Sequence, residues 1–207
     1  MIRVVIAEDH TLIREALAKM LVASRQIEVV GLASTGTEAI ALVEQTKPDV
    51  LLMDVTMPEK DGIAALADLA ALGTKTRTIM LTMHEDEAHG VRAMRAGAAG
   101  YVKKSANLDE LLDAIDRVHR GERVIPSEVE VALTRKRSDH PAQILSSREF
   151  QVMEYLAAGK TNREIAEMLS ISVKTVDTHR GHVLKKLRLR NNSDITRFAI
   201  QHGLMPV

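Results

Sequence analysis

The segment Asp49–Pro58, with the sequence DVLLMDVTMP, is the most informative part of the chain for its fold. Its apolar run is too short for a helix, and such a run bounded by turn-forming residues predicts a β-strand over Asp49–Met53. Pro58 predicts a loop, and apolar residues at helical spacing then predict a helix over Ile63–Leu72. The segment therefore predicts a strand–loop–helix unit in which Asp54 directly follows the strand.

The same strand–helix unit recurs on both sides of this segment. The predicted strands are Ile2–Ala7, Ile27–Ala33, Asp49–Met53, Thr78–Leu81 and Gly100–Val102, and the predicted helices are His10–Ala23, Thr37–Gln45, Ile63–Leu72, Glu85–Ala96 and Asn107 to about Arg120. Strands joined by helices run parallel, with right-handed crossovers and helices on both faces. Five units are too few to close a barrel. We therefore predict an α/β fold with a five-stranded, doubly wound parallel sheet.

The pattern becomes all-helical from Ser146. Ser146 and Glu149 have the spacing of a capping box, which predicts the start of a helix. The predicted helices run from there to about Ala158, then over Asn162–Leu169, Ser172–Leu187 and Ser193–Gln201. A short helix, a tight turn and a longer helix have helix-turn-helix spacing. We therefore predict an all-α helix-turn-helix domain of four helices.

These patterns predict an α/β domain over residues 1–120, a linker over 121–145 and a helical domain over 146–207. A short helix is expected at Ser127–Thr134. The basic triplet Arg135-Lys136-Arg137 has two interpretations, a phosphate contact or a solvated linker, and the second is favoured.

Charge separates the two parts of the chain, although the 207 residues have a formal net charge of zero. Residues 1–145 carry 18 basic and 22 acidic residues, whereas residues 146–207 carry 10 and 6. A net charge of −4 favours a cation as partner of the first part, and a net charge of +4 favours a polyanion for the second.

Composition excludes several classes of protein. The chain has no cysteine, so it has no disulfide and no thiolate metal site. Aromatic residues make up 2%, which argues against an aromatic-lined cavity for a sizeable ligand. No apolar run approaches the roughly 18 residues of a membrane span, and the N-terminus turns acidic where a signal peptide is apolar. We expect a cytoplasmic protein with no membrane partner.

Polar side chains follow four of the predicted strands. They are Glu8 and Asp9 after the first strand, Asp54 after the third, Thr82 after the fourth, and Lys103 and Lys104 after the fifth. The carboxyl ends of parallel strands meet at one edge of the sheet, where open α/β folds bind ligands. Three carboxylates there repel one another, and a divalent cation with oxygen ligands is the usual solution. Such a site activates a phosphoryl group, with one carboxylate as nucleophile.

These motifs resemble the receiver domain of bacterial response regulators, a flavodoxin-like fold, over residues 1 to about 120. The matching residues are Glu8-Asp9, Asp54-Val-Thr-Met-Pro58, Thr82 and Tyr101-Val-Lys-Lys104. The resemblance implies that Asp54 is the phosphoacceptor and that Thr82 and Lys104 contact the phosphoryl group. It implies a Mg²⁺ (or Mn²⁺) ion held by Glu8, Asp9, Asp54 and the backbone carbonyl of Thr56. Spacing matches Lys104, rather than Lys103, to the family's lysine.

Tyr101 is the only aromatic residue before Phe150. A lone tyrosine on a strand is either a core residue or a functional one. The resemblance implies a switch, in which the ring turns inward when Thr82 moves toward the phosphoryl group, and this interpretation is favoured.

Residues 146–207 resemble a LuxR-type helix-turn-helix domain, so the whole chain resembles response regulators of the NarL/FixJ type. The matching runs are Leu145–Glu149, Gly159–Ala166, Ser172–Val176 and Lys185–Leu187. The third helix of such a domain enters the major groove of DNA. The predicted DNA contacts are Asn162, Lys174, Thr175, Thr178, His179, His182 and Lys186. Asp177 either faces a cytosine amino group or points away from DNA.

Three hypotheses of function follow. The favoured one is a DNA-binding transcriptional regulator rather than an enzyme. Family resemblance implies that it accepts a phosphoryl group from a sensor histidine kinase, forms a homodimer and binds double-stranded promoter DNA, with RNA polymerase as a further candidate partner. A phosphatase or phosphotransferase is disfavoured, because no Asp-x-Asp motif follows a strand. A LuxR-type sensor of a small ligand is disfavoured by the shortage of aromatic residues.

Overall fold

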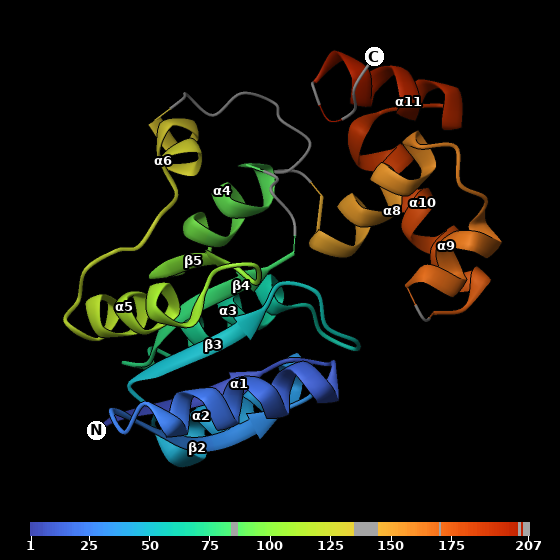
Figure 1. Ribbon diagram of the computed structural model, residues 1–207. Coiled ribbons are helices and arrows are strands. Elements are labelled where there is room, and N and C mark those ends of the chain that lie inside the picture. The colour runs from blue at the N-terminus through green and yellow to red at the C-terminus, as the bar shows by residue number, and fades with distance from the viewer. Residues whose placement is uncertain (84–86, 135–144, 170, 203, 205–207) are drawn as a thin grey trace. The chain divides into compact units, whose positions relative to one another are not determined.

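The computed structural model describes residues 1–83, 87–134, 145–169, 171–202 and 204. The chain divides into two compact units, Met1–Lys136 and Arg137–Val207 (Figure 1). The basic triplet at 135–137 and the start of the helix expected at Glu85 fall outside the described residues, as does Ser170 in the tight turn between the second and third helices of the helical domain.

A five-stranded parallel sheet with the strand order β2-β1-β3-β4-β5 forms the centre of the first unit. Its strands are β1 (Ile2–Ala7), β2 (Ile27–Ala33), β3 (Val50–Asp54), β4 (Arg77–Thr82) and β5 (Gly100–Lys103). The central strand β3 is buried along its whole length, as expected where helices cover both faces of a sheet. The strand order reverses at β1 and β3, which is where doubly wound sheets bind ligands.

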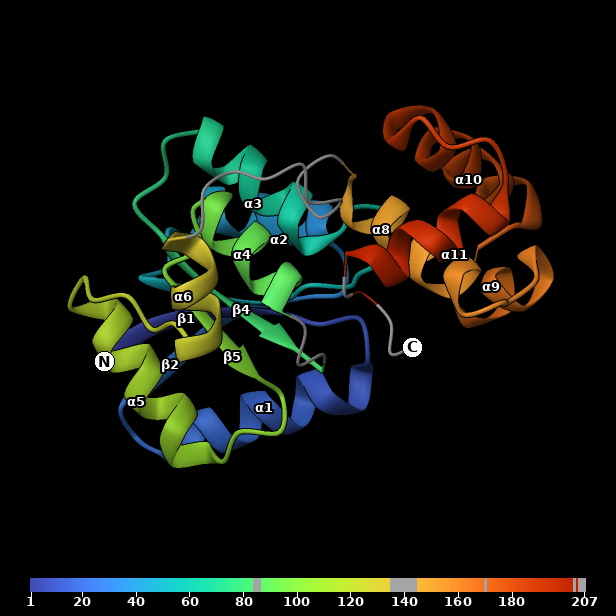
Figure 2. The ribbon, with the colours of Figure 1, turned by 90° about the horizontal axis from the view of Figure 1, so that it is seen from above.

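The connecting helices cover both faces of the sheet. They are α1 (Thr11–Ala23), α2 (Gly36–Thr46), α3 (Gly62–Ala71), α4 (Glu87–Arg95) and α5 (Leu108–His119). Seen from above, α1 and α5 lie on one face and α2, α3 and α4 on the other (Figure 2). Neighbouring strand residues belong to different cores, since Ile6 and Leu52 pack with α5 whereas Val5 and Leu51 pack with α2 and α3. The predicted doubly wound parallel sheet is confirmed.

The chain after α5 stays attached to the sheet, which differs from the linker expected over residues 121–145. The carbonyl of Val124 accepts a hydrogen bond from the N–H of Tyr101 (2.9 Å), in a bridge beside β5. Helix α6 (Ser127–Thr134) then packs against α4. The predicted short helix is present, but it belongs to the first unit, because Val129 is buried in the same core as Tyr101.

Within the described residues, the second unit consists of four helices, as predicted for the all-α domain. They are α8 (Ser147–Ala157), α9 (Asn162–Met168), α10 (Val173–Leu187) and α11 (Asn192–Gln201). Each begins at a polar side chain that accepts a hydrogen bond from a free backbone N–H of the first turn, namely Ser146, Thr161, Ser172 and Asn191. Helices α9 and α10 form the helix-turn-helix. None of the helices in the described part of the chain is long and apolar enough to span a membrane.

Gly90 of α4 allows α6 to approach closely. A Cβ atom on Gly90 would lie 2.4 Å from Cγ2 of Val129 and 3.3 Å from Cε1 of Tyr101, whereas carbon atoms pack best at about 3.5–4.0 Å. Glycine inside a helix costs about 1 kcal/mol relative to alanine. The close contact of α4 with α6 is the physical reason for a glycine at this position.

We expect Gly90→Ala to displace α6, because the overlap with Val129 outweighs the gain in helix propensity. Amide hydrogen exchange in residues 127–134 should become roughly tenfold faster, which corresponds to about 1.4 kcal/mol of local stability. The double variant Gly90→Ala/Val129→Ala removes the overlapping methyl groups, so its exchange should be slower than that of Gly90→Ala. Wild-type exchange in the single variant would contradict the close packing.

Candidate functional site

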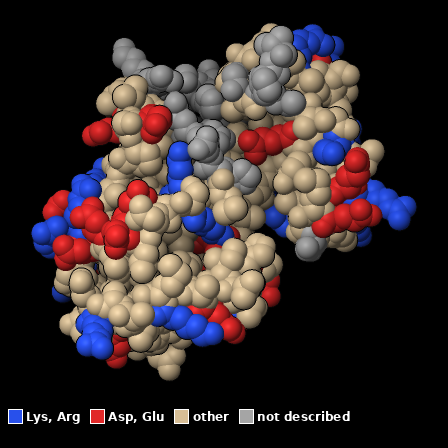
Figure 3. All heavy atoms as spheres, viewed as in Figure 1, with Lys and Arg blue, Asp and Glu red and all other residues tan. Residues whose placement is uncertain are grey.

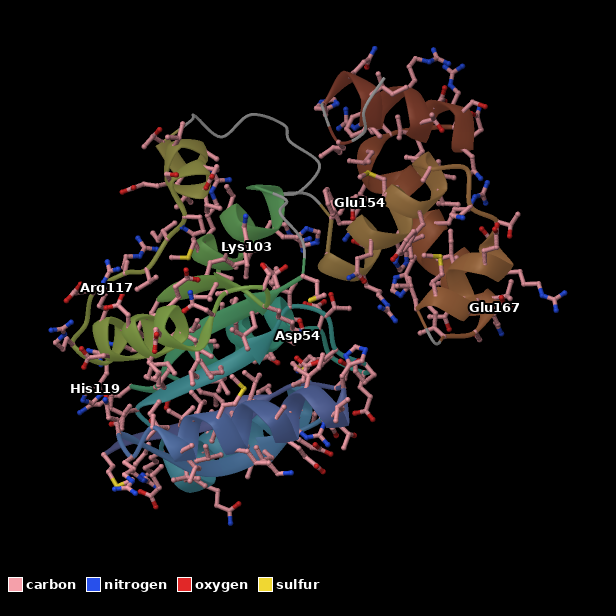
Figure 4. The ribbon with its side chains drawn as sticks, in the orientation of Figure 1. Asp54, Lys103, Arg117, His119, Glu154 and Glu167 are labelled. Carbon is pink, nitrogen blue, oxygen red and sulfur yellow. The ribbon has the colours of Figure 1, made fainter. Side chains whose placement is uncertain are left out.

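The carboxyl edge of the sheet brings together the polar residues expected there. Asp54 and Thr82 are the last residues of β3 and β4, and Lys104 directly follows β5. Glu8 and Asp9 directly follow β1. Figure 4 shows Asp54 at this edge, at the end of β3. Residues from four separate segments of the chain therefore meet at the edge where the strand order reverses.

Lys104 is the buried cation of this edge. Its Nζ lies 2.6 Å from Oε2 of Glu8 and 2.9 Å from Oδ2 of Asp54. All three side chains are nearly inaccessible, with exposed fractions of 8% for Lys104, 0% for Glu8 and 7% for Asp54. Lys103, in contrast, is exposed. The lysine that contacts the acidic residues is thus Lys104, the one that the family's spacing indicated.

The pKa of Asp54 is raised to about 6, chiefly because burial disfavours the charged carboxylate. Lys104 opposes this shift, and the neighbouring Glu8 carboxylate adds to it. Burial lowers the pKa of Lys104, but attraction by Asp54 and Glu8 outweighs burial, so the pKa of the lysine is raised. One lysine thus leaves the negative charge of the cluster partly uncompensated, and a further cation would be favourable there.

His10 is a site residue that the sequence analysis missed. Its Nδ1 lies 3.0 Å from Oε1 of Glu8 and 2.7 Å from Oδ1 of Asp9. The hydrogen bond to Glu8 and the charge of Asp9 raise the pKa of His10. Its position directly after an acidic pair at a strand end is the sequence signal that could have identified it.

The cluster has the donor set of a divalent-cation site. Ligand atoms of Glu8, Asp9, His10 and Asp54 lie within 4.8 Å of one another. Carboxylate oxygens are the ligands that Mg²⁺ and Mn²⁺ take in proteins. The backbone N–H of Thr56 donates to the Asp54 carboxylate, so Thr56 lies beside the cluster, and its carbonyl as a ligand stays a prediction.

Thr82 and Tyr101, the expected switch residues, are both buried, with exposed fractions of 1% and 4%. The N–H of Lys104 donates to the carbonyl of Thr82 (2.7 Å), which joins the end of β4 to the lysine. The ring of Tyr101 lies inward, in the core formed with Met94 of α4 and Val129 of α6. The structure therefore has the inward position that the resemblance associates with a Thr82 moved toward phosphate.

Most of the residues expected to contact DNA lie on the exposed side of α10. Lys174, Thr178, His182 and Lys186 are exposed, whereas Asn162, Thr175 and His179 are half-buried. Burial and the nearby charge of Arg148 lower the pKa of His179, so its ring is neutral at neutral pH. The visible face of the second unit carries both basic and acidic side chains (Figure 3).

Several of the polar residues on and beside α10 have partners within the protein. Oδ1 of Asp177 accepts a hydrogen bond from Asn162 (3.4 Å) and lies 3.5 Å from Nη1 of Arg180. Asp177, whose direction the sequence left open, therefore connects α10 to α9. Lys186 and His182 both contact the carboxylate of Glu149 on α8.

Helix α11 packs within its own unit through one face. Ile195 and Ala199 are fully buried. Phe198 is half-buried and its ring lies 4.1 Å from that of His202.

Two family models match the chain. The model of the response regulator receiver domain covers residues 4–116, and that of bacterial regulatory proteins of the luxR family covers residues 143–199. The oxygen regulatory protein NreC of Staphylococcus aureus is 35% identical over 214 residues, which are 98% of this chain and 99% of NreC.

Solved structures agree with these matches. The response regulator ChrA of a heme-sensing two-component system is 35% identical, with a TM-score of 0.55 over 99% of this chain and 98% of ChrA. The two-component response regulator RcsB in complex with DNA is 25% identical, with a TM-score of 0.59 over 97% of this chain and 98% of RcsB.

The fold, the acidic edge and the helix-turn-helix define a receiver domain joined to a DNA-binding domain, a class that regulates transcription rather than a class of typical enzymes. The chain belongs to the two-component response regulators of the NarL/FixJ type, with a LuxR-type helix-turn-helix, and is a phosphorylation-controlled transcriptional regulator. The family resemblance found in the sequence is confirmed, and the first of the three functional hypotheses is supported.

We expect Asp54→Asn to stabilise the first unit when divalent cations are removed by EDTA. A carboxylate whose pKa is raised to about 6 is destabilising in its ionised form, and each pKa unit corresponds to about 1.4 kcal/mol. Urea unfolding at neutral pH should show a gain of up to about 3 kcal/mol. Mg²⁺ should stabilise the wild type more than the variant, since it binds only the intact cluster.

Asp61→Asn is the matched control for this experiment. Asp61 caps α3 by accepting a hydrogen bond from the N–H of Ala64 (2.9 Å), and asparagine caps a helix equally well. Its stability and its response to Mg²⁺ should equal those of the wild type. A loss of stability in Asp54→Asn under EDTA would show that Lys104 fully compensates the charge of Asp54, and would contradict an excess of negative charge in the cluster.

Proposed function

We propose that Asp54 is the phosphoacceptor of this regulator. The observation that carries the proposal is the buried cluster at the point where strand order reverses, in which the Asp54 carboxylate lies 2.9 Å from Nζ of Lys104. The proposed ligands of the Mg²⁺ (or Mn²⁺) ion are Glu8, Asp9, Asp54 and the backbone carbonyl of Thr56. When bound, the ion neutralises charge on the phosphoryl oxygens.

In the proposed reaction, a carboxylate oxygen of Asp54 forms a bond to phosphorus. The bond from phosphorus to an imidazole nitrogen of a sensor histidine kinase breaks, and the imidazole keeps the electron pair and takes up a proton. Lys104 balances charge on the transferred group, and the hydroxyl of Thr82 donates a hydrogen bond to it. The reaction modifies the chain itself, so we propose no catalytic turnover of another substrate.

We propose that phosphorylation shifts the population of two receiver states. Thr82 moves toward the phosphoryl group, and Tyr101 is then held inward against α4 and α6. The buried ring, which lies in the same core as Val129 of α6, supports this route, because α6 leads toward the second unit along the chain. The proposed consequence is a homodimer with higher affinity for DNA.

We propose that α10 enters the major groove of double-stranded promoter DNA. The proposed contacts are Asn162, Lys174, Thr175, Thr178, His179, His182 and Lys186. The exposed side of α10 and the net charge of +4 over residues 146–207 support the proposal. RNA polymerase as a further partner and a cytoplasmic location stay predictions.

Acetyl phosphate with Mg²⁺ should label the wild-type chain and fail to label Asp54→Asn, because asparagine cannot form the acyl phosphate. Intact-mass spectrometry measures the added phosphoryl group directly. Asp61→Asn should be labelled like the wild type. Stoichiometric labelling of Asp54→Asn would assign the acceptor to another residue.

Binding of the chain to duplex DNA should weaken as salt rises, because phosphate contacts release counterions. Lys174→Ala should lower the slope of log K against log salt by about 1. Arg197→Ala removes an equal charge from an exposed residue of α11 that pairs with Asp194 (3.4 Å), and its slope should stay at the wild-type value. Equal slopes for the two variants would place the DNA surface elsewhere.

A further inference from the structure

Glu149 joins the start of α8 to the DNA-facing helix α10. Its Oε2 accepts a hydrogen bond from the N–H of Ser146 (2.7 Å), which closes the capping box of α8. The same oxygen lies 2.6 Å from Nζ of Lys186, and Oε1 lies 3.3 Å from Nδ1 of His182. Glu149 and Lys186 are 37 residues apart in the chain, so this is a tertiary contact between α8 and α10.

The two partners differ in exposure. The side chain of Glu149 is 5% exposed, whereas that of Lys186 is 41% exposed. Burial by itself raises the pKa of Glu149, but hydrogen bonds from Lys186 and Ser146 outweigh burial, so the pKa is lowered. The carboxylate is therefore ionised at neutral pH, and it balances the charge of Lys186 in the absence of DNA.

We propose that Glu149 is a positioning residue that withholds the charge of Lys186 from DNA and thereby restrains binding that is independent of sequence. This inference rests on the proposed binding of α10 to DNA. Contacts to phosphate supply most of the non-specific affinity, whereas contacts to base edges supply discrimination. A lysine neutralised by a buried acid adds little to the non-specific affinity. More of the binding then depends on residues that discriminate between sequences.

The substitution Glu149→Gln separates this role from helix capping. Glutamine serves at the third position of a capping box as glutamate does, so the link to Ser146 is kept. The negative charge beside Lys186 is lost, and the ammonium becomes available to a phosphate.

The test measures the affinity of the full chain for a fluorescent duplex of arbitrary sequence over a series of salt concentrations. At pH 8, where histidines carry little charge, the comparison reports on Lys186 rather than on His182. Glu149→Gln should bind more tightly, by about 5- to 10-fold at 0.1 M salt, with a slope steeper by about 0.9. The gain should vanish in Glu149→Gln/Lys186→Gln. The substitution Lys186→Gln should change the slope less in the wild-type chain than in the Glu149→Gln variant.

Glu164→Gln is the matched control. Glu164 occupies the same capping-box position in α9, and its carboxylate lies 3.8 Å from the exposed Lys160. The variant adds the same charge to the unit, and its slope should stay at the wild-type value. An equal increase in Glu164→Gln would show an effect of net charge alone and would overturn the inference.

Two further outcomes also overturn the inference. One is a wild-type slope in a folded Glu149→Gln variant, and the other is a gain that persists in the double variant. Should Glu149→Gln unfold, Glu149→Asp keeps the charge on a side chain that is shorter by one methylene group, and its slope should lie above that of the wild type. Failure of the wild type to bind the duplex at low salt would instead contradict the proposed function.

Discussion

The burial of Lys104 against both Glu8 and Asp54 is the constraint on which the arrangement of the strands in the first unit depends. The two ion pairs join the ends of β1 and β3 to the residue after β5. A buried charge that is left with no partner at all is strongly destabilising, and a one-residue slip of a strand turns its side chains to the opposite face. The cluster therefore constrains both the register and the order of the strands. A sheet that misplaced β3 would bury the Asp54 carboxylate away from its lysine.

Much of this arrangement follows from local patterns in the sequence. Short apolar runs predict the strands, and the position of each acid directly after its strand predicts a shared edge, because parallel strands end on the same side. The spacing to Tyr101 selects Lys104 over Lys103, and only Lys104 of the two is withdrawn from solvent. These predictions succeed because backbone topology alone carries the residues to one place.

Tertiary packing was harder to predict, because it depends on pairs of residues far apart in the chain. Residues 121–145 were expected to form a linker with a short helix, yet that helix, α6, packs on α4. The absence of a side chain at Gly90 makes room for Val129. No local pattern in either segment reports this fit. The contacts of Glu149 with Lys186 and of Asp177 with Asn162 are missed for the same reason. In both cases a residue expected to face DNA also has a partner within the protein.

Asp54 and Glu149 are both buried acids, yet their pKa values shift in opposite directions. Burial by itself would raise the pKa of both carboxyl groups. For Asp54, burial and the repulsion of Glu8 prevail over Lys104, and the pKa is raised to about 6. For Glu149, hydrogen bonds from Lys186 and Ser146 prevail, and the pKa is lowered. The receiver site is thus short of positive charge and suited to a cation and a phosphoryl group. The charge of Glu149 is already compensated by Lys186. Glu149 is therefore suited to neutralising this lysine rather than to binding an added ion.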